Sequence, residues 1–275
     1  MQRIALVDES FDLNLTREYM LSIQVSLDGF SYSVLDPGKK KVICLYHQDT
    51  FTHEPGFHLK KLNAIYDEVD LLHVAYKKTK IYYAAPDRTT LVPIAAFRQD
   101  LAEDFYRLTL DPGKNGKILV SLIPDMASYA IYEIDRAVLA FLQEKHPGSV
   151  VQNDLVLSVF GCPPGIAVMK VRILRKQLVV LTLQDNINFY NSYSYEGEND
   201  ILYYLLGAVK NMELKPEAVI LDGMVSQREG ICHRLRQYFE HVELAGNNPQ
   251  VHYSRLLGQL PNARFTNLFN SFSCV

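Results

Sequence analysis

Residues 20–48 have the hydrophobic pattern of three short strands. Apolar and polar residues alternate from Leu21 to Leu27, which is the period of a strand with one buried face. The following Asp28-Gly29 pair is typical of a tight hairpin turn. The pattern predicts two further strands at 30–35 and 42–46. We therefore expect a three-stranded antiparallel unit near the start of the chain.

The same pattern recurs in residues 166–194, again as three short strands. Each group of three is followed by an amphipathic helix and by one more strand. The helix and strand are predicted at about 57–72 and 80–85 after the first group. After the second group we expect a helix to about 212 that is capped by Asn199, a strand at 218–221 and a further helix at about 226–240. Two copies of one strand–strand–strand–helix–strand unit predict a duplicated α/β fold with two lobes and a cleft between them.

The stretch between the two copies, at about 79–152, predicts an inserted small α+β subdomain. Its helices are expected at 95–108 and 135–145, and its strands at 117–123 and 128–133. The first of these helices would turn four apolar residues inward: Phe97, Leu101, Phe105 and Leu108.

Two prolines and two glycines in residues 161–165 disfavour both helix and central strand. We therefore divide the chain into a first lobe at 1–160, which contains the inserted subdomain, and a second lobe at 161–275. Residues 1–18 have no periodicity and are expected to form an arm. The tail after Asn247 is rich in apolar residues, so we expect it to pack against the body or against a partner.

Composition excludes several classes of function. The 275 residues are 48% hydrophobic and 21% charged, as in ordinary globular proteins. The net charge is −3, and the basic residues are scattered, so the chain has no basic patch suited to nucleic acid. The first residues show no basic region followed by an apolar stretch, so we expect no signal peptide. No apolar run approaches the roughly 20 residues needed to span a bilayer. We expect a cytoplasmic protein with no nucleic-acid partner and no membrane span.

The cysteines do not predict a metal site or disulfides. Cys44, Cys162, Cys232 and Cys274 are far apart, with no CxxC pair, which favours reduced thiols. The chain also has no GxSxG, HExxH or GxxxxGK[ST] motif. We therefore expect no bound metal and identify no catalytic residue.

The order of elements resembles the actin-like ATPase, or ribonuclease-H-like, superfamily. The branch that it most resembles contains the pilus-platform and bacterial division proteins, on the basis of Ile81–Pro86, Thr90–Pro93 and Ile118–Val120. Thr90–Pro93, taken with Asn191–Tyr193 and Asp200–Tyr204, also resembles an uncharacterised bacterial family of unknown function. The resemblance covers about residues 20–245. It implies two mixed sheets with ATP bound between the lobes.

The resemblance also identifies candidate cleft residues. Active members of the superfamily carry an Asp and then a Gly in the first hairpin of each lobe, which position Mg²⁺ and admit the phosphates. Gln24 and Ser26 stand at these positions in the first lobe, and Lys170 and Arg172 in the second. Asp222-Gly223 matches the adenosine-side motif, with one of its two glycines lost.

Lys170 and Arg172 cannot hold a hard dication. We therefore predict a catalytically inactive actin-like scaffold or protein-interaction module of unknown function, a pseudo-ATPase without a cofactor. The alternative is a nucleotide or phospho-ligand binding protein, or an ATPase, in which these atypical cleft residues contact the anion directly, and ATP stays open as its ligand. A sugar or acyl kinase is a third class, but it needs a catalytic carboxylate that we do not identify.

If the cleft is inert, function must lie on a surface that binds a protein partner. The sequence offers a tyrosine-rich junction at 188–204 and the apolar tail at 256–275. Tyrosine is well suited to protein interfaces. A homo-oligomer is left open.

Overall fold

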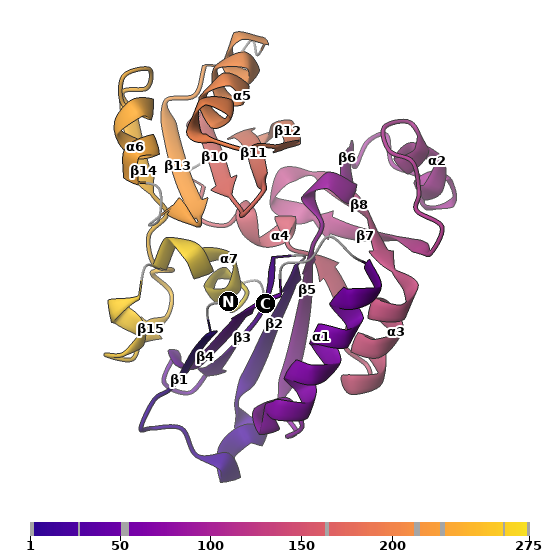
Figure 1. Cartoon of the computed structure of the whole chain (residues 1–275), viewed down its shortest axis with the longest axis vertical. Helices are drawn as coiled ribbons and strands as arrows, with labels where there is room; N and C mark the ends of the chain where they lie inside the picture. The colour runs from indigo at the N-terminus through magenta and orange to yellow at the C-terminus, as the bar shows by residue number, and fades with distance from the viewer. Residues whose placement is uncertain are drawn as a thin grey trace.

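The computed structural model of the chain describes residues 3–26, 28–50, 55–162, 165–211, 215–225, 229–260 and 262–273. Within these residues the strands form three sheets. Figure 1 shows one sheet at the bottom, a second at the top and the smallest at the side between them.

The first sheet contains a strand order that the second sheet repeats. Its strands are β1 (Arg3–Val7), β2 (Met20–Ser26), β3 (Gly29–Asp36), β4 (Lys41–Asp49), β5 (Lys78–Ala84), β9 (Val151–Asn153) and β15 (His252–Tyr253). The order is β1-β4-β3-β2-β5-β9, with β15 pairing β4. The strands β2 to β4 are antiparallel, and β5 and β9 are parallel to β2.

The second sheet has the order β12-β11-β10-β13-β14, which matches β4-β3-β2-β5-β9 in both order and direction. Its strands are β10 (Val168–Ile173), β11 (Gln177–Gln184), β12 (Asn186–Ser194), β13 (Ala218–Gly223) and β14 (His241–Leu244). The prediction of two duplicated mixed sheets is therefore confirmed.

The third sheet forms the inserted subdomain, in the order β6-β8-β7. It contains β6 (Thr89–Pro93), β7 (Gly116–Ile123) and β8 (Ser128–Asp135), and α2 (Ala102–Arg107) packs on it. The short elements of the chain are η1 (Leu13–Glu18), η2 (Asp70–Leu72), η3 (Pro86–Arg88), η4 (Gln99–Leu101), η5 (Pro124–Met126) and α4 (Leu155–Ser158).

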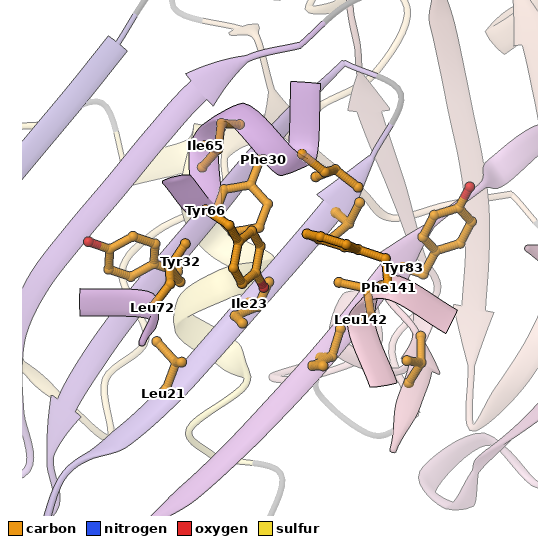
Figure 2. Close-up of a cluster of buried hydrophobic side chains, with 14 of the residues drawn as sticks. Leu21, Ile23, Phe30, Tyr32, Ile65, Tyr66, Leu72, Tyr83, Phe141 and Leu142 are labelled. Carbon is orange, nitrogen blue, oxygen red and sulfur yellow. The ribbon is translucent and has the colours of Figure 1, made fainter. Parts of the chain in front are cut away.

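Helices α1 (Pro55–Glu68) and α3 (Arg136–Lys145) cover one face of the first sheet (Figure 1). Figure 2 shows the aromatic centre of this core, where the ring of Tyr66 lies 5.8 Å from that of Phe30 and 5.0 Å from that of Phe141. In the second lobe, α5 (Glu198–Asn211) and α6 (Glu229–Leu235) pack on the second sheet.

The C-terminal tail covers the other face of the first sheet. It forms η7 (Leu257–Gln259), η8 (Asn262–Phe265) and α7 (Thr266–Asn270). Leu268 and Phe269 of α7 are fully buried in a cluster with Leu45 of β4. The tail also contacts the second lobe, because η8 touches β13, and Figure 1 shows α7 between the two lobes. The prediction that the tail packs against the body is confirmed, and the sheet that it covers belongs to the first lobe.

Four local predictions are wrong. Instead of an arm, Arg3–Val7 form β1, whose Ile4 and Leu6 pack against the tail-side core. The helix predicted at 95–108 begins only at Ala102, because the chain from Pro93 turns through the hydrogen bond from Phe97 N to Pro93 O, and Leu108 is exposed.

The second lobe holds the other two differences. Asn199 is not a cap: it is the second residue of α5, and its Oδ1 accepts a hydrogen bond from Arg234. The helix predicted at about 226–240 is described only from Glu229, as α6, and it ends at Leu235. Residues 226–228 lie outside the described residues. No helix in the described part of the chain is long and apolar enough to cross a membrane.

Candidate functional site

The six residues identified from the sequence all lie in the cleft between the lobes. The strands β2 and β10 are the equivalent first strands of the two sheets, and each has a parallel neighbour, β5 or β13. Because the carboxyl ends of parallel strands share one sheet edge, side chains there face a common crevice. Gln24, Ser26 and Gly223 line one cavity, Lys170 and Asp222 line another, and Arg172 lines both.

The space that remains in the cleft is small. The cavity at Lys170 has a volume of about 30 Å³, and the cavity at Gln24 has about 70 Å³. A single water needs about 10–15 Å³, so the two cavities hold a few waters each. Side chains, rather than open space, fill the position between the lobes.

Arg172 lies at the centre of the side chains that fill the cleft. Its Nε donates to Asp222 Oδ1 and its Nη1 donates to Asp154 Oδ2, both at 2.7 Å. Asp222 comes from β13 in the second lobe, whereas Asp154 follows β9 in the first. All three side chains are almost completely buried. Charge-assisted bonds of this length are strong, so Arg172 ties the lobes together.

Asp154 collects hydrogen bonds from three parts of the chain. Its Oδ2 accepts from Gln24 Nε2 at 3.1 Å and from Asn267 Nδ2 at 3.3 Å, in addition to Arg172. Burial raises the pKa of the Asp154 carboxyl, and Arg172 acts in the opposite direction. Burial alone would lower the pKa of Arg172, but Asp222 and Asp154 outweigh it and raise that pKa. The two carboxylates therefore hold Arg172 in its charged form.

Lys170 forms hydrogen bonds with the backbone of the first lobe. Its Nζ donates to the carbonyl oxygens of Ser158 at 2.7 Å and Phe160 at 3.0 Å. Ser158 is the last residue of α4, so the ammonium satisfies carbonyls that the end of a helix leaves without partners.

Ser26 and Gly223 also have local backbone roles. Ser26 Oγ and the backbone of Gly29 exchange two hydrogen bonds of 3.0 Å, which close the β2–β3 hairpin. Gly223 has a φ of +85°, and a Cβ there would lie 2.3 Å from Ile173 O. The backbone contact with Ile173 alone therefore requires glycine at this position.

A second ionic cluster, which sequence reasoning missed, lies beside the first. Asp49 at the end of β4 places Oδ1 2.9 Å from Arg264 Nη2 and Oδ2 3.3 Å from Arg175 Nη2. Arg175 also donates its backbone N–H to Asp28 at 3.1 Å. A carboxylate of the protein itself thus occupies the position between two guanidinium groups. Burial raises the pKa of Asp28.

The charges that line the cleft cancel. The described lining residues include four cations, Lys170, Arg172, Arg175 and Arg264, and four carboxylates, Asp28, Asp49, Asp154 and Asp222. The net charge of these eight groups is therefore zero. An anion entering the cleft would meet no excess of positive charge.

His47 forms contacts that superficially match a hydrolytic triad. Its Nδ1 lies 2.8 Å from Ser31 Oγ, and its Nε2 lies 3.0 Å from Asp49 Oδ1. However, Arg264 Nη2 lies 2.8 Å from the same Nε2, and arginine can only donate. Nε2 must therefore accept, and the proton is on Nδ1, which donates to Ser31. In this tautomer His47 cannot act as a base toward Ser31.

Burial and then Arg264 lower the pKa of His47, which keeps the ring neutral. The cluster is thus suited to holding Asp49 and Arg264 in place rather than to acyl transfer. Within the described residues, no three His, Cys, Asp or Glu side chains are grouped as metal ligands. The positions that would face Mg²⁺ and phosphate carry Gln24, Ser26, Lys170 and Arg172, a donor set that does not fit a magnesium nucleotide.

The tyrosine-rich junction at 188–204 is divided between the core and the surface. Tyr195 is buried, and Tyr190 donates its hydroxyl to Pro86 O at 3.0 Å across the lobes. Tyr193 and Tyr204 stack with ring centres 4.4 Å apart. Tyr203 is the exposed member of the group, at 75%.

Comparison with solved structures identifies proteins of similar fold. A Bacteroides thetaiotaomicron protein with an actin-like ATPase fold and unknown function is 20% identical, with a TM-score of 0.82 over 96% of this chain and 99% of that one. The PilM–PilN type IV pilus biogenesis complex gives 11% identity and a TM-score of 0.64, over 91% and 96%. The ethanolamine utilization protein EutJ from Carboxydothermus hydrogenoformans gives 9% and 0.51, over 96% and 92%.

These similarities confirm the predicted actin-like ATPase fold, and at such identities they show the fold alone. The model of a family described as "Protein of unknown function (DUF3822)" matches residues 8–162 and 163–242. No curated protein matches the chain.

Proposed function

The chain belongs to this family of proteins of unknown function, and we propose that it is a catalytically inactive actin-like scaffold that binds another protein. Its lobes are joined by its own side chains in place of ATP and Mg²⁺. On this proposal it is a cytoplasmic pseudo-ATPase that needs no cofactor.

The observation that carries the proposal is the position of Arg172 between Asp154 and Asp222. A nucleotide could enter only if this arginine left both carboxylates. Breaking a buried ion pair costs about 3–5 kcal/mol, because it leaves an unpaired buried charge. The four cleft carboxylates would then face the polyphosphate and repel it.

The expectation of a protein partner follows from the loss of cleft chemistry in a retained fold. The PilM–PilN structure is a complex between a pair of proteins in pilus biogenesis. It gives a precedent for a fold of this shape working through protein contacts. A fixed cleft would present the surfaces of both lobes in one constant arrangement.

Calorimetric titration with ATP and ADP, with and without Mg²⁺, tests the inactive cleft. We expect no saturable heat and no ATP hydrolysis from the purified full-length chain. The matched variant is Arg172→Gln, which keeps a polar side chain but removes the charge, with circular dichroism as the control for folding. Saturable, Mg²⁺-dependent binding or hydrolysis by the wild type that Arg172→Gln weakens would overturn the proposal.

The alternative is a nucleotide or phospho-ligand binding protein that uses Lys170 and Arg172 to contact the anion. Four cations line the cleft, and this is the observation in its favour. It predicts binding of pyrophosphate or ATP without Mg²⁺, weakened by salt and by Lys170→Gln. The Lys170 ammonium already donates to the carbonyl oxygens of Ser158 and Phe160, and this favours the scaffold proposal instead.

A further inference from the structure

A space larger than either cleft cavity lies between two sheet edges, one from each lobe. It is lined by Thr89, Thr90, Leu91 and Pro93 of β6 and by residues 187–192 of β12, together with Pro86, Asp87, Thr109, Leu110 and Ser128. We call it the edge groove. Its volume is about 510 Å³, several times that of either cavity in the cleft. Figure 1 shows β12 and β6 facing each other.

Both walls of the edge groove are strands with one neighbour. Among the described strands, β12 pairs with β11 alone and β6 pairs with β8 alone. An edge strand has a row of backbone N–H and C=O groups without sheet partners, and it can accept another strand. Native proteins commonly block such edges with lysine, proline or a bulge. The β12 segment Asn186–Ser194 contains no charged residue and no proline. Its register shift lies toward its beginning, between the pairs Ile187–Leu183 and Phe189–Thr182, and residues 189–194 pair with β11 without a shift.

The hydrogen bonds at the end of β12 show which backbone groups face outward. Tyr195 N donates to Lys176 O at 3.2 Å, so Tyr195 is bonded to the strand beside it. In an antiparallel pair, bonded and non-bonded residues alternate, and the register pairs Ser192 with Val179 and Tyr190 with Leu181. Ser194, Ser192 and Tyr190 therefore direct their N–H and C=O groups away from β11.

One of these outward groups is covered by a neighbouring side chain. Ser192 N donates to Asn191 Oδ1 at 2.8 Å. This contact lies between adjacent residues, and rotation of the exposed Asn191 side chain releases it. An incoming carbonyl oxygen can then take its place at no loss of hydrogen bonding.

We propose that the edge groove binds an extended segment of a partner protein, which pairs with β12 as an additional strand. The inference rests on the proposed scaffold function, for which it names the binding surface and the kind of partner. Alternate backbone groups of the segment pair with Tyr190 and Ser192, and its side chains meet the half-buried Thr90 of β6.

The charge of the edge groove indicates which charge the bound segment should carry. Asp87 is the one charged residue among its described lining positions, and it is exposed. A segment with a single basic residue near Asp87 is therefore complementary, whereas an acidic segment is repelled. The stretch of β12 that lines the groove, residues 187–192, corresponds to a segment of about six residues.

Selection from a displayed library of random nine-residue linear peptides, on the immobilised full-length chain, tests the proposal. We expect peptides with dissociation constants in the micromolar range. Ser192→Pro should weaken them at least tenfold, because proline removes the outward N–H but leaves the ladder with β11 intact. Ser192→Ala is the matched control: it keeps the N–H and should bind within about twofold of the wild type.

A second measurement tests the proposal even if Ser192→Pro does not fold, as judged by circular dichroism. Methylating the backbone nitrogens of a selected peptide one at a time should abolish binding at alternate positions only, which is the signature of strand pairing. Failure to select any peptide, equal binding by the Pro and Ala variants, or uniform tolerance of methylation would overturn the proposal.

The chain could instead dimerise through β12 and bind no peptide. Dimerisation that Ser192→Pro abolishes would assign β12 to a second copy of the chain, and this result would also overturn the proposal. The ATP titration is independent of these outcomes. If the chain binds neither ATP nor peptides, only the edge-groove proposal fails. If it binds ATP, the scaffold proposal itself fails.

Discussion

His146 is a buried histidine that should make stability depend on pH. It caps the end of α3, and its Nε2 lies 2.8 Å from the hydroxyl of Tyr66. Burial, and then the nearby His73, lower the pKa of His146 from 6.5 to about 4. Between these values the unfolded chain binds a proton that the folded chain does not, so the free energy of unfolding falls as the pH is lowered through this window.

We expect the loss between pH 6.5 and pH 4 from this residue to reach up to about 3 kcal/mol. His146→Gln keeps an acceptor for Tyr66 but cannot titrate, so it should flatten this part of the profile. Urea unfolding of both proteins at a series of pH values measures the difference. Parallel profiles for the two proteins would show that His146 is not the source.

Residues of the cleft show what a sequence pattern can and cannot give. The resemblance to the actin-like superfamily pointed to Gln24 and Arg172, and both line the cleft cavities. It could not identify Asp154, which lies 130 residues from Gln24 and 113 from Asn267, because no local pattern encodes so distant a partner. The signal that was available is an Asn-Asp pair at the end of a strand, Asn153 being the last residue of β9 and Asp154 the next residue, at the sheet edge where sites form. The proposed binding roles of the cleft residues stay predictions.

The β10 and β13 strands meet so closely at Gly223 that this position determines whether the second sheet can form. The φ of +85° and the 2.3 Å that would separate a Cβ at this position from Ile173 O both exclude larger residues. We expect Gly223→Ala to lower the free energy of unfolding by about 2 kcal/mol or more, because the backbone must shift or strain.

Gly207 is the matched control for this change. It lies inside α5, where a Cβ meets nothing within 4 Å. Alanine favours helix over glycine by about 0.5–1 kcal/mol, so Gly207→Ala should stabilise the chain. Thermal unfolding of the two variants should therefore shift in opposite directions. A harmless Gly223→Ala would refute the steric argument.

Elements with several turns of regular pattern were easier to predict than short ones. The α1, α3 and α5 helices and the six hairpin strands were found because their apolar stripes are long. By contrast, β1 has five residues, and its half-buried side chains, Ile4 and Leu6, are too few to define a period. The 95–108 prediction failed because Phe97 and Phe105 keep a helical spacing across a turn, and their rings lie 6.4 Å apart.

At the scale of the whole molecule, charge balance between the lobes is the property to test. Arg172→Met leaves Asp154 and Asp222 as unpaired buried carboxylates, and we expect it to destabilise the chain by about 3–5 kcal/mol. Neutralising them as well, in the triple variant with Asp154→Asn and Asp222→Asn, should restore most of that loss, because no buried charge then lacks a partner.

Urea unfolding at neutral pH compares the two variants with the wild type. The triple variant serves as the control for volume, since all three substitutions are close to the originals in size. If Arg172→Met unfolds at the same urea concentration as the wild type, the ion pairs do not hold the lobes together. If both variants are equally unstable, the loss comes from packing instead of charge.

The tail that covers the first sheet has a consequence for the order in which the protein can be completed during synthesis. Arg264 follows His47 by 217 residues along the chain, yet the two side chains touch, and Phe269 seals the face of the strand that carries His47. Ribosomes add about 5–20 residues per second. The apolar face of β3 and β4 therefore waits for roughly ten to forty seconds after it emerges. During that interval the nascent first lobe exposes Leu45 and its apolar neighbours, and this surface is open to aggregation until residues 262–273 cover it.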